Sequence, residues 1–287
     1  MVFENTTKKQ WLKVGLIVLI ITIFRTMLQP LIPEGESSPF PPSAFVEMGL
    51  VPVAFVIYGV VMLGLLAIVF VLIQDRLPGT RLVKGLTFSV AFGMLWFIAL
   101  LEPLPHGTWQ LPEVLYYPVV DGVTLASLGL LLGAFVATDS KKPVSLRISP
   151  ELLALVVIPV VFLVGRVVSY YVLGIYSSVD TRLFDTILWT FVFGLWIAVM
   201  YLMLKAGIAG TSPLAQAAFF GVIIFGINLF LNNLFMPIPF ELKIWEMGTF
   251  SYIDLIARAA VDIIAVTTGA FICERIIAAI TGRRASP

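Results

Sequence analysis

Residues 51–74, VPVAFVIYGVVMLGLLAIVFVLIQ, hold no charged side chain and form one continuous apolar stretch. The hydrocarbon core of a bilayer is about 30 Å thick, and an α-helix needs about 20 apolar residues to cross it. This stretch is long enough and apolar enough to cross, so it predicts a membrane-spanning helix.

Seven further stretches share this length and character, and short polar breaks separate them. The eight predicted spans are approximately Trp11–Gln29, Val51–Gln74, Val83–Leu101, Val114–Thr138, Leu152–Leu173, Thr186–Leu204, Leu214–Phe235 and Tyr252–Ile277. No break between them is long enough for a separate soluble domain. The sequence therefore predicts an all-α integral membrane protein with eight transmembrane helices.

The composition of the whole chain excludes several classes of protein. Of its 287 residues, 60% are apolar and 12% are charged, whereas an average soluble domain is about 45–50% apolar and about 25% charged. The net charge is only +1 and no basic block is present, so a nucleic-acid partner is not expected. Membrane lipids are the expected surroundings.

Residue counts also limit the chemistry of the chain. It has one cysteine, Cys273, and one histidine, His106, so neither an internal disulfide nor a Cys/His zinc site is expected. A nucleotide-binding G-x-x-x-x-G-K-[ST] motif is also absent from the sequence. We therefore expect no metal and no cofactor.

Basic residues fall in alternate loops, which predicts the orientation of the chain. One side receives Lys8, Lys9, Lys13, Arg76, Arg81, Lys84, Lys141, Lys142, Arg147, Lys205, Arg275, Arg283 and Arg284, and the other receives only Arg182 and Lys243. We therefore expect a multi-pass protein of the cell membrane with both termini in the cytoplasm. The first apolar run is too long for a cleavable signal peptide and is expected to be a retained span.

Charged residues recur at a fixed offset, which suggests an internal repeat. An offset of 141 positions aligns Arg25 with Arg166, Glu113 with Asp254, and Asp121 with Asp262. Two repeats, residues 1–140 and 141–287, would each hold four spans. Because four is even, the repeats would run parallel and be related by a pseudo-two-fold axis along the membrane normal. A chance alignment is the alternative.

Five charged residues lie deep in predicted spans, at least four positions from either end, where an unpaired charge costs about 2.5–3.5 kcal/mol or more. They are Arg25, Arg166, Arg258, Asp121 and Asp262. At a rise of about 1.5 Å per residue, Arg25 lies about 6 Å and Asp121 about 10 Å from the outer ends of their spans. These depths allow one Arg–Asp pair in each repeat, but the spacing leaves open which arginine meets which aspartate.

The last span carries a row of charged side chains. Asp254, Arg258 and Asp262 are four residues apart and share one helix face. Glu113, Tyr117 and Asp121 make the matching row on the fourth span. Such rows either fix the register of helices or bind a cation, a proton or a zwitterion.

Less specific sequence patterns concern helix packing. Asn228 and Asn232 share a face of the seventh span, which favours interhelical hydrogen bonds. Gly129-x-x-x-Gly133 predicts a close-packing face, and Pro159 predicts a loosened or kinked fifth span. The residues predicted to bind a substrate or ion are Arg25, Asp121, Arg166, Arg258, Asp262, Asn228 and Asn232, and none is predicted to be catalytic.

Three functions fit this pattern. The first is a transporter or channel for a small solute or ion, with its charged site between the two halves. The second is an intramembrane enzyme for a lipid-linked substrate, for which Glu102 with His106 and Glu241 with Glu246 are the candidate groups. The third is a non-catalytic assembly subunit. A homo-oligomer or a membrane partner is compatible with each of them.

Overall fold

The computed structural model describes residues 7–28, 41–102, 111–140, 150–208, 210, 212–233, 235–244 and 251–281. Eight helical segments in this part of the chain are long and apolar enough to cross a membrane. They are α1 (Lys8–Leu28), α3 (Val51–Gln74), α4 (Arg81–Ala99), α6 (Leu111–Phe135), α7 (Ala154–Tyr171), α8 (Leu183–Leu204), the composite segment Pro213–Asn233, and α11 (Tyr252–Thr281). The predicted helical fold and the eight spans are confirmed, and the chain is a polytopic membrane protein.

Short helical elements complete the described chain. A four-residue helix α2 (Ala44–Glu47) precedes α3, and the 3₁₀-helices η2 (Pro150–Leu153) and η3 (Lys205–Gly207) extend α7 and α8. The composite seventh span consists of α9 (Pro213–Ala218), the π-helix η4 (Phe219–Gly226) and α10 (Ile227–Asn233).

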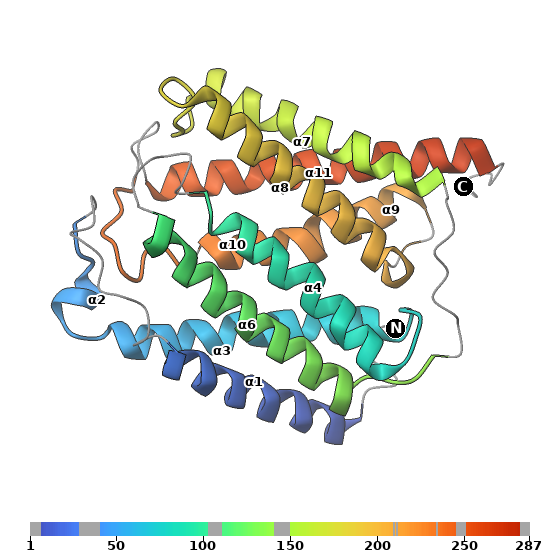
Figure 1. Ribbon diagram of the computed structural model, residues 1–287, viewed down its shortest axis with the longest axis horizontal. Helices are drawn as coiled ribbons and strands as arrows, with labels where there is room; N and C mark the ends of the chain where they lie inside the picture. Colours follow the sequence, from blue (N-terminus) through green and yellow to red (C-terminus); the bar gives the residue numbers. More distant parts are fainter. Residues whose placement is uncertain are drawn as a thin grey trace.

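We divide the eight spans, which are shown in Figure 1, into two groups of four in chain order. We call α1, α3, α4 and α6 the first quartet, and α7, α8, α9–α10 and α11 the second quartet. In the first quartet α1 packs against α3 and α6, and α4 packs against α6. In the second, α7 packs against α8 and α11, and the α9–η4 segment packs against α11.

The two ends of the bundle differ in which helix termini they hold. An even number of spans brings the start of α1 and the end of α11 to one end, which we call the terminal end (Figure 1). The other end, where α1 ends and α11 begins, is the distal end. Arg25 lies in the last turn of α1, close to the distal end.

Glycines let α4 and α6 approach closely, as the Gly129-x-x-x-Gly133 pattern predicts. A Cβ atom built on Gly85 of α4 would lie 2.5 Å from the carbonyl oxygen of Gly129 and 2.9 Å from the Cα of Gly133. Real side chains do not tolerate such distances, so only glycine allows this backbone contact. The predicted close-packing face is confirmed.

The seventh span departs from regular α geometry, and two other spans contain an internal proline. The π-helix η4 occupies the middle of the seventh span, and π-helical turns are rare in proteins. Gly221 within it packs so closely on α11 that an added Cβ would lie 2.8 Å from the Cα of Thr267. Pro159 lies inside α7 and Pro118 inside α6, and each helix continues through its proline.

Aromatic donors join the two quartets through hydrogen bonds. Trp189 and Trp196 of α8 donate to the carbonyl oxygens of Ile98 (2.9 Å) and Ala91 (3.1 Å) at the α4 side. Tyr58 of α3 donates to the carbonyl oxygen of Leu231 (3.0 Å) on α10. Each bond gives a Trp or Tyr donor an acceptor in an apolar interior, where an unmet polar group is costly.

Candidate functional site

The first quartet holds one buried ion pair, between Arg25 of α1 and Asp121 of α6. The Arg25 Nε donates to Asp121 Oδ1 at 2.7 Å, and the two side chains are only 3% and 2% exposed. The guanidinium also lies 5.8 Å from the ring centres of both Phe55 and Tyr58, within the range of cation–π attraction. The pair is therefore neutral as a unit and removed from solvent.

Aromatic rings surround this first pair. Phe235, just after α10, packs against Phe55 (ring centres 5.4 Å apart), Tyr58 (6.0 Å) and Tyr117 (5.8 Å). These three contacts join the second quartet to side chains near Arg25. The environment favours a charge pair that stays together, since separating the charges in apolar surroundings would be costly.

The second quartet holds the corresponding pair, between Arg166 of α7 and Asp262 of α11. Here the contact is bidentate, with Arg166 Nε and Nη2 each 2.7 Å from an Asp262 carboxylate oxygen. The rings of Phe162 and Trp189 lie 5.4 Å from the guanidinium carbon, and Arg166 Nη1 lies 3.3 Å from the hydroxyl oxygen of Tyr170. Bidentate pairing fixes both the orientation and the partner.

Unlike the first, the second pair continues toward the distal end through Glu102. Glu102 Oε1 accepts hydrogen bonds from Arg166 Nη1 (2.9 Å) and from Arg258 Nη1 (3.0 Å). Arg258 Nη2 donates to the carbonyl oxygen of Tyr176 (2.8 Å) and lies 3.9 Å from Asp254 Oδ2. We call Glu102, Arg166, Arg258, Asp254 and Asp262 the distal cluster.

The distal cluster combines burial with one contact to solvent. Its Arg166, Asp262 and Asp254 side chains are 1–2% exposed and that of Arg258 is 7% exposed, whereas the Glu102 side chain is 25% exposed. With every group ionised, three carboxylates and two guanidinium groups give the cluster a charge of −1. Among the described residues, Arg258 Nε has no hydrogen-bond acceptor although it is buried.

The structure resolves which arginine meets which aspartate, and it brings most of the predicted site residues into these two groups. Arg25 pairs with Asp121, and Arg166 pairs with Asp262, so each pair forms within one quartet. Arg258 joins the second pair through Glu102. The role of these residues in binding stays a proposal.

The two predicted asparagines lie elsewhere. Asn228 is buried on α10 and its Oδ1 accepts a hydrogen bond from Trp96 Nε1 of α4, so the predicted interhelical use is confirmed for this residue. Asn232 is half-buried near the end of α10. Neither asparagine belongs to the distal cluster.

The sequence did not predict the contacts of Glu102 with Arg166 and Arg258, and it offered this residue only as a candidate catalytic group with His106. Glu102 follows the end of α4, so its position relative to the fifth and eighth spans depends on tertiary packing. His106, Glu246 and the side chain of Glu113 lie outside the described residues. The matching row on the fourth span is therefore described only at Tyr117 and Asp121.

A second polar group, which the sequence did not single out, lies near the terminal end. Lys205 Nζ lies 2.9 Å from both the Tyr201 hydroxyl oxygen and Glu274 Oε1, and Tyr201 itself donates to Glu274. These three residues join α8 to α11 on the side opposite to the distal cluster. Because the lysine and glutamate balance each other, we interpret this group as a contact that fixes the two helices.

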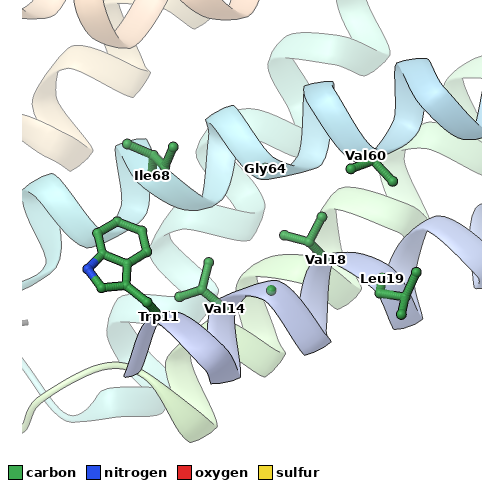
Figure 2. Close-up of a pocket in the computed structure, with 8 residues that line it drawn as sticks. Trp11, Val14, Val18, Leu19, Val60, Gly64 and Ile68 are labelled. Carbon is green, nitrogen blue, oxygen red and sulfur yellow. The ribbon is translucent and has the colours of Figure 1, made fainter. Parts of the chain in front are cut away.

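An apolar groove lies between α1 and α3 (Figure 2). Its volume is about 420 Å³. The residues that line it are Trp11, Val14, Gly15, Val18, Leu19, Val60, Gly64 and Ile68. Its lining lacks ionisable side chains, so this groove differs chemically from the distal cluster.

The carboxylates of the distal cluster are already engaged by its arginines, which neutralise most of their charge. Within the described part of the chain, no three Cys, His, Asp or Glu side chains are grouped so as to hold a metal ion. What the cluster offers chemically is a set of fixed cationic donors and one partly exposed carboxylate.

Comparisons with known proteins give no relative from which a role could be carried over. No family model, no curated protein and no solved structure matches the chain.

Proposed function

We propose that this membrane protein transports a small solute or ion and that the distal cluster is its binding site. The observation that carries the proposal is the extension of the buried Arg166–Asp262 pair through Arg258 to the partly exposed Glu102. Ionisable groups within membrane spans are costly, and they commonly mark pathways for substrates, ions or protons. A pair that served only to fix two helices would need no such extension.

We further propose that the two quartets are parallel four-helix repeats, residues 1–140 and 141–287. Two observations support this. The partners of each buried pair are separated by the same 96 positions in the sequence. The α1–α3, α1–α6 and α4–α6 contacts of the first quartet also have counterparts in the α7–α8, α7–α11 and η4–α11 contacts of the second. With both termini in the cytoplasm of the cell, the distal cluster would face the outside.

The test is solute flux into proteoliposomes that contain the purified protein. Tracer uptake would be measured for rubidium, lactate and inorganic phosphate, for the wild type and for Arg258→Gln. We expect uptake of at least one tracer, and at least a tenfold loss in the variant, because the variant removes one of the two cations that the cluster positions.

Asp185→Asn is the matched control for this flux experiment. Asp185 forms an ion pair with Arg182, three residues earlier, and both side chains are 43% exposed. The change therefore removes a carboxylate near the start of α8, outside the distal cluster. Wild-type flux in Arg258→Gln, or an equal loss in Asp185→Asn, would contradict the proposed site.

A second candidate function, a non-catalytic assembly subunit, is favoured by the groove between α1 and α3. Gly15 and Gly64 leave open space there, since an added Cβ on either would meet no atom within 4 Å. Small residues of this kind allow a transmembrane helix of another protein to approach. Stable co-purification of a second membrane protein that is lost in Gly64→Leu, together with absent flux, would favour this function.

A further inference from the structure

We propose that Glu102 occupies the distal cluster as a tethered carboxylate, and that protonation of Glu102 releases Arg166 and Arg258 to bind the carboxylate of a small organic anion. The inference rests on the proposed function in that it uses the same site. It adds the chemical class of the ligand and the event that makes the site available.

The geometry around Glu102 is that of an occupied anion site. Two arginine Nη1 atoms from different helices converge on a single oxygen, at 2.9 Å from Arg166 and 3.0 Å from Arg258. Charge-assisted bonds of this kind are about twice as strong as neutral ones. The two guanidinium groups are held by Asp262 and by the Tyr176 carbonyl, so they would stay in place when Glu102 leaves.

Glu102 is the member of the cluster that is best suited to leave. It comes from the first quartet, whereas the other four members belong to the second. It follows the end of α4 and is not inside a span, and its side chain is 25% exposed. A proton from the distal solution therefore has a more direct route to Glu102 than to the buried aspartates.

The groups that face Glu102 decide what its protonation does. From α7 these are Arg166 and Tyr170, and from α11 they are Arg258, with Asp254 and Asp262 behind the arginines. Trp189 of α8 contributes an uncharged ring against Arg166. Without the Glu102 charge, two guanidinium groups remain opposite two carboxylates.

The exchange conserves the charge of the cluster. A proton from solution binds a carboxylate oxygen of Glu102, and the two hydrogen bonds from Arg166 and Arg258 are broken. The incoming carboxylate then accepts both bonds, so the cluster carries −1 before and after the exchange. One proton and one monoanion enter together, and the step adds no net charge to the buried site, where added charge would be costly.

Arg258 adds a reason to expect a ligand with more than one oxygen-bearing group. Its Nε is buried and has no acceptor among the described residues, which is an unfavourable state for a donor. A single glutamate oxygen does not reach this nitrogen in the structure. A 2-hydroxy acid such as lactate brings a hydroxyl besides its carboxylate, so lactate is a suitable probe.

The test is equilibrium binding of radiolabelled lactate to the full chain in lipid nanodiscs, at pH 5.5 and pH 7.5. For the wild type we expect at least tenfold tighter binding at pH 5.5. Glu102→Gln resembles the protonated side chain, so it should bind lactate with nearly the same affinity at both pH values. Arg258→Gln should lose at least tenfold in affinity, and the control Asp185→Asn should behave as the wild type.

A second variant keeps the test decisive if Glu102→Gln folds poorly. Glu102→Ala empties the site, so it should also bind lactate at pH 7.5. The proposal is overturned if the variants keep the pH dependence of the wild type, if lactate binding is not saturable at pH 5.5, or if inorganic phosphate alone binds. Lactate binding without flux would contradict the proposed transport but support this inference. Flux of another tracer without lactate binding would support transport and contradict this inference.

Discussion

Each quartet contains a buried Arg–Asp ion pair, but the surroundings of the two pairs differ. In the first, Arg25 and Asp121 lie among the rings of Phe55 and Tyr58, and both charges are balanced within the pair. In the second, Arg166 and Asp262 make a tighter, bidentate contact and pass a further hydrogen bond to Glu102. One pair is enclosed, whereas the other connects to the distal end.

This difference distinguishes two roles of a buried ion pair. One is to specify which helices pack together, and the other is to provide charged groups that a ligand can bind. An enclosed pair specifies which helices meet, and its net contribution to stability is often small because desolvation offsets attraction. A pair with an additional carboxylate near solvent can exchange that carboxylate for another group. Experiments should therefore compare equivalent substitutions in the two ion pairs and test whether their effects differ.

The largest effect is expected from removing one arginine at a time. Arg25→Met leaves Asp121 as an uncompensated buried charge, and breaking such a pair typically costs about 3–5 kcal/mol. Arg166→Met leaves Asp262 in the same state and also removes the bond to Glu102, which adds about 1.5–3 kcal/mol for a bond to a charged group. Unfolding free energies in mixed detergent micelles would measure both losses.

The two arginine variants should differ in how much unfolding free energy they lose. Arg166→Met should be the more destabilising variant, and Asp185→Asn should change the unfolding free energy by less than about 1 kcal/mol, as is usual for an exposed pair. Equal losses for the two arginines would show that the bond to Glu102 adds nothing, and the contrast between the quartets would disappear.

The fold was largely predictable because length and apolar character alone decide a transmembrane helix. Residues 51–74 were predicted as a span and form α3 without a change of boundary. The Gly129–Gly133 face was predictable for a similar reason, since a helix repeats its faces every three to four residues. The π-helix Phe219–Gly226 was not predicted, because its residues are as apolar as those of an α-helical span.

Three buried members of the distal cluster, Arg166, Arg258 and Asp262, were predictable as candidate site residues, whereas the partly exposed Glu102 was not. Arg166 and Asp262 stand out because charges are rare within apolar runs, and they align with Arg25 and Asp121 at the offset of 141 positions. Glu102 lies after a span, where carboxylates are common, so nothing local marks it. Its contact with Arg258, 156 positions away, depends on how α4 packs beside the second quartet.

A smaller effect is expected at the glycine contact of the first quartet. In Gly129→Ala the new methyl group would lie 2.8 Å from the Gly85 carbonyl oxygen, so α4 and α6 must separate, and overpacking of this kind costs about 1–3 kcal/mol. Gly64→Ala is the control, because an added Cβ there meets no atom within 4 Å. A thermal unfolding series would test whether only the first variant loses stability.

This glycine pair also bears on the comparison of the quartets. In the second quartet a close glycine contact is made by Gly221 against Thr267 of α11, through a π-helical segment. If Gly129→Ala left the stability of the protein unchanged, the α4–α6 contact would be able to adapt to a larger side chain.

The smallest effect is expected when both members of the enclosed pair are replaced together. Arg25→Leu with Asp121→Leu removes two charges and leaves apolar side chains among the rings of Phe55 and Tyr58. Replacing a whole buried pair by apolar residues is often neutral or stabilising, so the unfolding free energy should stay within about 1 kcal/mol of the wild type. The same double change at Arg166 and Asp262 also removes the hydrogen bond from Arg166 to Glu102, so it should cost more. If instead the first double variant were the less stable one, the enclosed pair would hold the fold together, and the pair connected to the distal end would be the replaceable one.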